Sequence, residues 1–208
     1  MVIAMHFDRW ARDIEAQLVE LAEQRTFRFR ATRRAHAAAY LLAMRRCEGL
    51  TDAEISSLET AIGQPVPGAY RAFVRRFGRA RGHLFRGSDV EPRELPAYRA
   101  DADGLVVGHD PLPRDAIVFL VHQGYTFCWF AAGDDPPVMQ FVEGEGHRPC
   151  APQFTTFVEA ELTQMKQVNA LAREQGGTFL TVTEAGAREI YPARSSGTRP
   201  IDTDDELL

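Results

Sequence analysis

Apolar side chains recur every three or four residues in the first quarter of the chain, which is the spacing of an amphipathic helix. The first such segment runs from Asp8 to Glu23 and has the apolar positions Phe7, Trp10, Ile14, Leu18 and Leu21. We predict a helix there whose apolar side is covered by another element. Residues 35–47 are rich in alanine and leucine and predict a second helix. It should pack on the first through small side chains at Ala35, Ala38, Ala39, Leu42 and Ala43.

A third helix is predicted to begin at Thr51. Thr51 is suited to cap the helix, and Glu54 stands three residues later, so the two form a capping box. The helix should bury a stripe of Ile55, Leu58 and Ile62. Gly63 predicts its C-terminal end, because glycine readily adopts the left-handed conformation that closes a helix.

A proline-containing corner separates this helix from the next one. Pro65 and Pro67 lack a backbone N–H and favour extended geometry in the residues before them, so the chain should turn. Residues 69–77 then resume a helical pattern, with a buried face of Tyr70, Phe73, Val74 and Phe77. Beyond this helix we predict a short strand near residues 83–85 and a polar connection over residues 91–102.

Short apolar runs separated by Gly, Pro and Asp clusters predict strands in the second half of the chain. The runs are residues 105–108, 116–121, 125–131 and 138–142. Their close spacing predicts an antiparallel meander. Residues 125–131 place aromatic side chains on both faces of the strand, so we expect both faces to be covered. Residues 144–149 are predicted to form a loop.

A last helix should begin near Thr155 or Thr156, because Thr156 and Glu159 have capping-box spacing. Its apolar stripe is Val158, Leu162, Met165, Val168 and Leu171, and Gly176 and Gly177 should end it. Residues 178–183 favour an additional edge strand, and we expect residues 195–208 to be mobile.

These elements predict an α+β fold in which an antiparallel sheet of about four to six strands packs against helices. We divide the chain into an N-terminal helical extension (1–48), an α+β domain (49–177) and a C-terminal strand or tail (178–208). The composition, with 45% hydrophobic and 25% charged residues, is that of an ordinary soluble globular protein. The N-terminus reaches Asp8 before any apolar run of signal-peptide length, so we expect a cytoplasmic protein without a membrane span.

The net charge of −5 is unevenly distributed along the chain. Residues 1–100 contain 17 arginines and 12 acidic residues, whereas residues 101–208 contain 7 basic and 17 acidic residues. Such a division can place opposite fields on different surfaces and steer a charged partner to one of them. The segment RTFRFRATRR (25–34) has a composition that could bind nucleic acid, but a solvated face with inward aromatics is favoured, so we expect no direct nucleic-acid partner.

Candidate catalytic residues are few. His109 and His122 lie next to predicted strand ends and could act in acid–base chemistry, although hydrogen-bonded turn histidines are favoured. Cys128 lies between two aromatic residues and is expected to be a core residue rather than a reactive thiolate. The scattered histidines and the three cysteines have no metal-ligand or disulfide spacing, and no phosphate-binding or nucleophile motif occurs. We expect neither an enzyme nor a bound cofactor or metal.

Acidic residues flank the predicted strands and could line the rims of the meander. They are Asp101, Asp103, Asp110, Asp115, Asp134, Asp135, Glu143 and Glu145. The charged exterior of any protein with acidic turns explains them equally well. Our candidate partner-binding residues are Asp101, Asp103, Asp110, Asp134, Asp135, Glu143 and Glu145.

The stretch LTDAEISSLETAIGQPVPGAYRAFVRRFG (50–78) resembles the N-terminal signature of the SUKH superfamily. The positions that match are Glu59, Gly63, Pro67, Tyr70, Phe73 and Gly78. Farther on, LPRDAIVFLVHQGYTFCWFAAGDDPPVMQFVEGEG and QFTTFVEAEL resemble the sheet and closing helix of bacterial members, with DPPV (135–138) at the turn into the last strand. The resemblance covers residues 50–162. Phe77 departs from it, because an asparagine often stands there.

The resemblance implies an α+β fold whose bacterial members often act as immunity proteins against polymorphic toxins, frequently nucleases. It supplies no catalytic residues. The function it implies is binding of a cognate toxin's effector domain. The alternatives are a scaffold or regulatory module with a housekeeping partner, and an enzyme that uses His109 or His122. The sequence leaves the oligomeric state open, and the N-terminal helical pair could be a brace on the core or a second binding surface.

Overall fold

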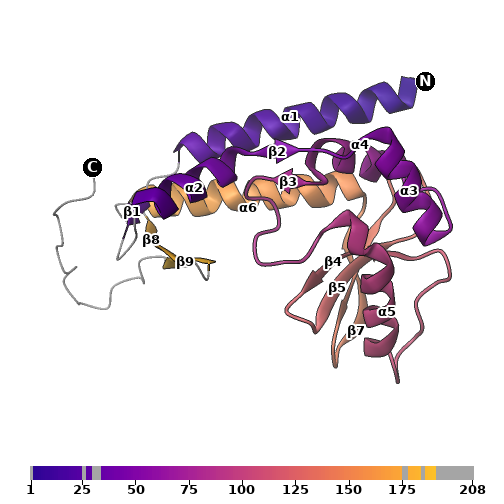
Figure 1. Ribbon diagram of the computed structural model, residues 1–208. Helices are drawn as coiled ribbons and strands as arrows, with labels where there is room; N and C mark the ends of the chain where they lie inside the picture. Colours follow the sequence, from indigo (N-terminus) through magenta and orange to yellow (C-terminus); the bar gives the residue numbers. More distant parts are fainter. Residues whose placement is uncertain (1, 25–26, 30–33, 175–177, 184–185, 191–208) are drawn as a thin grey trace.

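The computed structural model describes residues 2–24, 27–29, 34–174, 178–183 and 186–190 (Figure 1). Its helices are α1 Val2–Gln24, α2 Arg34–Arg45, α3 Asp52–Ile62, α4 Gly68–Phe77, the 3-10 helix η1 Pro92–Glu94, α5 Leu95–Leu105 and α6 Phe154–Glu174. Its strands are β1 Phe27–Phe29, β2 Cys47–Glu48, β3 Ala80–Arg81, β4 Ile117–His122, β5 Thr126–Phe130, β6 Val138–Val142, β7 Gly146–Ala151, β8 Thr178–Thr183 and β9 Gly186–Ile190.

The predicted α+β fold is confirmed. The main sheet is an antiparallel meander in the order β4-β5-β6-β7, and α5 packs along β4 (Figure 1). β2 and β3 form a second, two-stranded antiparallel sheet. β8 lies between β1, to which it is parallel, and β9, so it is the central strand of a third sheet and not the predicted edge strand. None of the helices in the described part of the chain has both the length and the apolar composition needed to cross a membrane.

The corner between α3 and α4 forms as local sequence signals predict. Thr51 and Glu54 make a reciprocal capping box at the start of α3, and Gly63 closes the helix in the left-handed conformation with φ 74°. Pro67 occupies the N-cap position of α4, where a backbone N–H would have no intrahelical acceptor. The four predicted core side chains of α4 are all buried, as are Ile55 and Leu58 of α3.

Aromatic side chains from α4, α6 and the sheet form the centre of the core. Tyr70 and Phe154 make edge contacts at 5.5 Å between ring centroids, and both contact Phe119 of β4 and Phe130 of β5. Every residue of β5 is buried, which confirms that both faces of this strand are covered. Aromatic residues bury large areas in such contacts, so this cluster contributes much of the stability that holds α4 and α6 on the sheet.

Helix α1 packs on α4 and runs alongside α6 (Figure 1). Four residues of its predicted apolar stripe are buried in the common core: Phe7, Ile14, Leu18 and Leu21. Trp10, the fifth, is half-buried against the core, and Ala11, which was not predicted, is buried beside it. Ion pairs from Arg75 to Asp8 and from Arg76 to Glu15 join α1 to α4, and Trp10 Nε1 donates to Glu159 of α6 at 3.1 Å. These contacts make α1 a brace on the core, one of the two roles considered from the sequence.

Helix α2 is present, but its buried face was predicted incorrectly. The five residues expected at the helix contact are all exposed to solvent, whereas Met44 is buried. Alanine is compatible with either side of a helix, so alanine spacing alone does not identify the contact face. The arginine-rich segment over residues 25–34 lies partly outside the described residues, and residues 195–208 lie wholly outside them. The solvated arginine face and the mobile C-terminal segment therefore stay predictions.

The predicted polar connection over residues 91–102 is wrong, because η1 and α5 occupy it. Pro96 falls in the first turn of α5, where the missing N–H costs no helical hydrogen bond. Leu95, Tyr98 and Ala102 follow at helical spacing and are buried. The strand predicted at residues 105–108 is therefore replaced by the end of α5 and a turn, in which His109 N–H donates to the Val106 carbonyl at 2.8 Å.

Two other strand predictions need correction. The short strand lies at Ala80–Arg81, paired with β2, and not at residues 83–85, where Phe85 has φ 55°. The predicted loop at residues 144–149 is largely β7, because the β6–β7 turn closes at residues 143–145. β7 is at one edge of the meander, and an edge strand tolerates Pro149 because the missing N–H can face away from the ladder.

Helix α6 begins at Phe154, before the predicted Thr156 cap. The N-terminal N–H of Thr155 is instead satisfied by Asp135 from the β5–β6 connection, at 3.0 Å. The buried stripe follows Val158 and Leu162 as predicted but then continues through Asn169 and Ala172, and Leu171 is exposed. The glycines predicted to end the helix lie outside the described residues.

Candidate partner-binding site

Two hairpin turns lie side by side at one end of the main sheet. Residues 123–125 join β4 to β5, and residues 143–145 join β6 to β7. The Glu143 N–H donates to the Tyr125 carbonyl at 2.9 Å, which continues the β5–β6 ladder into the turns. Gln123 and Gly124 both have positive φ, at 53° and 78°, as the two central residues of a type I′ turn require. We call this end of the sheet, with the loop over residues 106–111, the distal rim.

His147 of β7 attaches the loop over residues 106–111 to the main sheet. Trp129 Nε1 donates to His147 Nδ1 at 3.3 Å, and His147 Nε2 lies 2.9 Å from the Asp110 carbonyl oxygen. An indole N–H can only donate, so Nδ1 is the acceptor and Nε2 carries the proton given to Asp110. His109 also packs edge-on against Phe141 at 5.3 Å between ring centroids. The loop is therefore attached to β6 and β7 by two side chains.

Three of the predicted partner-binding carboxylates come together at the distal rim: Asp110, Glu143 and Glu145. All three residues are exposed. Glu145 also accepts a hydrogen bond from Arg148 at 3.1 Å, which partly neutralises it. The distal rim thus carries a concentration of negative charge on short, well-braced turns.

The other predicted carboxylates lie elsewhere. Asp101 and Asp103 are exposed on α5, where Asp103 pairs with Arg99 at 3.0 Å. Asp134 and Asp135 lie at the opposite end of the sheet, where the Ala69 N–H of α4 donates to the Asp134 carbonyl at 2.8 Å. Asp115 joins that end through the Ala132 N–H, which lies 3.4 Å from its carboxylate. The carboxylates therefore form three separate groups instead of one continuous ring.

Two exposed apolar side chains accompany the acidic group at the distal rim. Tyr125 is 43% exposed, with its hydroxyl donating to Gln123 Oε1 at 2.7 Å, and Val107 is 80% exposed. The hydrophobic pattern did not identify Tyr125 and Val107 as surface residues, because each lies in an apolar run that was predicted to be a strand. The sequence did contain one signal for exposure, because Tyr125 directly follows Gly124 and Val107 directly precedes Gly108, and glycine often marks a turn.

The two histidines considered for catalysis are held in separate places. His109 packs on Phe141, whereas His122 Nδ1 lies 3.0 Å from the Ser88 hydroxyl, a contact that the sequence did not indicate. A serine activated by histidine needs a third group to orient the imidazole, and no hydrogen bond from His122 to a carboxylate is found in the described part of the chain. Within the same residues, no group of three or more His, Cys, Asp or Glu side chains is placed to hold a metal ion.

The cysteines differ in environment. Cys128 is buried in the sheet, as predicted, and a hydrogen bond with Cys150 together with burial raises its pKa. The same hydrogen bond, assisted by the Arg148 guanidinium, lowers the pKa of the exposed Cys150 to about 7. The proton therefore stays on Cys128, and Cys150 is the thiol with thiolate character near neutral pH.

Comparison with known families gives one match. The model of the SMI1 / KNR4 family (SUKH-1) matches residues 49–160, which is more than half of the chain. The match begins just before the α3–α4 corner, includes the distal rim and all of the main sheet, and ends in α6. It confirms the resemblance stated from the sequence over residues 50–162. No curated protein matches the chain.

Proposed function

Because the chain belongs to the SMI1 / KNR4 family (SUKH-1), we propose that it is a cytoplasmic immunity protein that binds a cognate bacterial toxin and occludes its effector domain. The observation that carries this proposal is the distal rim, where exposed carboxylates of Asp110, Glu143 and Glu145 stand beside exposed Tyr125 and Val107. Charged residues around apolar anchors are the usual composition of a specific protein interface.

The carboxylates and the apolar residues would contribute in different ways. Nucleases present basic surfaces to the phosphates of their substrate. Carboxylates at the distal rim would attract such a surface and accelerate encounter, with an effect that weakens as salt is added. Tyr125 would lose its exposed area on binding and supply affinity, since aromatic residues dominate interface energetics. Occlusion of a toxin requires no catalytic group on this chain. This agrees with the family resemblance, which implies no catalytic residues.

Co-expression with the product of a neighbouring toxin-like gene tests the proposal. Wild-type protein should restore growth and form a complex with the toxin. The variant Asp110→Asn/Glu143→Gln/Glu145→Gln should associate about tenfold more slowly at low salt, with little difference at high salt. Tyr125→Ala should instead speed dissociation.

Two outcomes would count against this function. One is toxicity that the wild-type protein leaves unaltered, with no complex formed. The other is stable co-purification with a non-toxin protein through the same surface, which would favour the scaffold or regulatory alternative. The matched control is Asp101→Asn/Asp134→Asn, which removes exposed carboxylates away from the distal rim and should leave association unchanged.

A further inference from the structure

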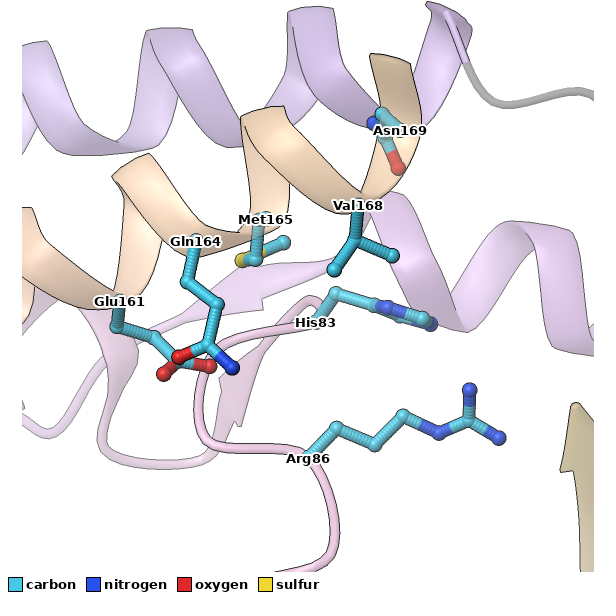
Figure 2. A pocket seen from close by; sticks show the side chains of 7 residues that line it. All are labelled: His83, Arg86, Glu161, Gln164, Met165, Val168 and Asn169. Carbon is cyan, nitrogen blue, oxygen red and sulfur yellow. The ribbon is translucent and has the colours of Figure 1, made fainter. Parts of the chain in front are cut away.

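A cleft of about 190 Å³ lies between α6 and the loop that follows β3 (Figure 2). The residues that line it are His83 and Arg86 from the loop and Glu161, Gln164, Met165, Val168 and Asn169 from α6. Along the helix, Figure 2 shows Glu161 and Gln164 at one end of the cleft and Asn169 at the other, with the two apolar residues between them. These helix residues follow the end of the family match at residue 160, and neither the match nor the distal rim assigns a role to the cleft.

Asn169 contributes a buried acceptor to one end of the cleft. The side chain is 3% exposed, and its Nδ2 donates to the Leu21 carbonyl of α1 at 3.1 Å. A carbonyl oxygen needs a donor, so this contact fixes the orientation of the carboxamide and turns Oδ1 away from α1, toward the side of α6 that carries Val168 (Figure 2). Among the described residues, Oδ1 has no donor, and a buried acceptor without a donor is unusual in proteins. One neutral acceptor matches the single N–H of an amide, whereas an ammonium there would leave two N–H groups unpaired.

Glu161 and Gln164 supply oxygen acceptors at the other end of the cleft. One Glu161 oxygen accepts the Phe85 N–H at 3.3 Å, and burial raises the pKa of the carboxyl group above its ordinary value. No basic side chain pairs with Glu161 in the described structure. Gln164 stands three residues later on the same face of α6, and Figure 2 shows its side chain beside that of Glu161. A carboxylate next to a carboxamide oxygen matches the three N–H donors of an ammonium, which in turn favours the charged form of the carboxylate.

The length of the cleft sets the length of a ligand that reaches both ends. Glu161 and Asn169 are eight residues apart in α6, which is about 12 Å along the helix axis. An extended lysine residue measures about 7 Å from its backbone nitrogen to Nζ. A hydrogen bond of about 2.9 Å at each end increases its reach to about 13 Å. Met165 and Val168, both half-buried, present apolar surface to the methylenes between the two polar groups.

We propose that this cleft binds a lysine residue of a partner protein. The ε-ammonium pairs with the acceptors at the Glu161 end, and the methylenes lie on Met165 and Val168. The backbone N–H of the lysine donates to Asn169 Oδ1, which supplies the donor that this buried oxygen lacks. Arg86 forms part of the wall and takes no part in the contact. None of the residues of the distal rim lines the cleft, so the proposal does not depend on toxin binding.

The test adds a blocked lysine residue, Nα-acetyl-L-lysine N-methylamide, to the full chain and follows the NMR signals of the Asn169 carboxamide and the Met165 methyl group. The lysine probe should shift these resonances in a saturable way. The norleucine analogue lacks the ammonium and should bind about tenfold more weakly or worse, as expected for loss of a charge-assisted hydrogen bond. The Nα-methyl analogue lacks the backbone N–H and should bind about fivefold more weakly. Glu161→Gln should weaken binding of the lysine probe about tenfold and leave binding of the norleucine analogue unchanged.

Gln167→Ala changes an exposed side chain of α6 that does not line the cleft and should bind the lysine probe like the wild type. The proposal is overturned if the lysine probe leaves the Asn169 resonances unchanged, which would mean that the cleft holds water only. It is equally overturned if either analogue binds as tightly as the lysine probe, or if Glu161→Gln has no effect. Tighter binding of 1,5-diaminopentane than of the lysine probe would also overturn it, because the cleft would then be a site for a free diamine. Circular dichroism of each variant verifies that the fold is retained.

Discussion

Asp135 caps helix α6 from a different part of the chain: its two carboxylate oxygens accept the Thr155 N–H at 3.0 Å and the Thr155 hydroxyl at 2.6 Å. The residue lies in the connection between β5 and β6, twenty positions before Thr155. A negative charge at the N-terminus of a helix is also favoured by the helix dipole. One carboxylate therefore fixes the start of α6 relative to the main sheet.

Replacing Asp135 with alanine should lower the free energy of unfolding by about 1 kcal/mol, the usual cost of losing a helix N-cap. Asp134→Ala is the matched control, because the neighbouring residue is exposed and its side chain makes no hydrogen bond within the described residues. Urea denaturation of both variants measures the difference. Equal stabilities would show that the Asp135 contacts contribute nothing in solution.

Tyr70 and Tyr98 should respond in opposite ways to loss of the hydroxyl. Tyr70 is 1% exposed, and its hydroxyl makes no hydrogen bond in the described structure. Tyr70→Phe should therefore leave the free energy of unfolding unchanged or raise it by about 1 kcal/mol. The Tyr98 hydroxyl bonds to the Glu91 N–H at 3.1 Å and to its carboxylate at 3.2 Å. Tyr98→Phe should lower the free energy of unfolding by about 1 kcal/mol. Thermal unfolding measures both variants, and a Tyr70→Phe protein less stable than Tyr98→Phe would contradict the prediction.

The capping box makes stability depend on pH through Glu54. Hydrogen bonds from the Thr51 N–H and hydroxyl, and then from Arg79, lower the pKa of Glu54 to about 2. A carboxyl whose pKa is lower in the folded state stabilises the protein above its unfolded pKa, near 4.5, and loses that contribution as the pH falls toward 2. Wild-type stability should thus fall more steeply over this range than that of Glu54→Gln, which keeps a capping side chain without a titrating group. A stability curve of Glu54→Gln that runs parallel to the wild-type curve over this pH range would refute the assignment.

Cys150 should be alkylated at a lower pH than an ordinary thiol. With its pKa lowered to about 7, the rate of reaction with iodoacetamide should rise with pH around a midpoint near that value. Arg148→Gln removes the nearby cation and should shift the midpoint upward, whereas Arg148→Lys should keep most of the effect. Mass spectrometry separates Cys150 from Cys47, whose pKa burial raises to about 11. A midpoint at about 8.5, the pKa of a free cysteine, would show that the pKa of Cys150 is not lowered.

Local signals in the sequence were sufficient for the α3–α4 corner and for the first three strands of the meander. The capping box spans three residues and Gly63 acts on its own helix, so neither depends on the rest of the fold. The apolar runs over residues 116–121 and 125–131, separated by a short segment that contains Gly124, likewise predict β4 and β5 locally. The acidic turn over residues 143–145 could be located for the same reason, because it directly follows a predicted strand, whereas Asp101 and Asp103, which were expected beside a strand, lie on α5.

Interactions between distant segments decided the remaining features. α5 is recognisable only once the sheet exists to bury Leu95 and Tyr98, because Pro92 just before it and Pro96 in its first turn are otherwise typical of a connection. β7 has a Gly- and Pro-containing sequence and is a strand because β6 pairs with it. Which carboxylates meet at the distal rim depends on strand register and on His147, which binds the loop carrying Asp110.

The sequence by itself therefore determined the family, the fold class, the capped corner and the candidate acidic residues, because those rest on contacts within a few positions of the chain. Only the tertiary structure separated Asp135, a cap for α6, from Asp110, Glu143 and Glu145 at the exposed rim. It alone also placed Asn169, Glu161 and Arg86 around one cleft. Such groupings arise when segments many residues apart pack together, and residue type and local spacing do not predict which segments do so.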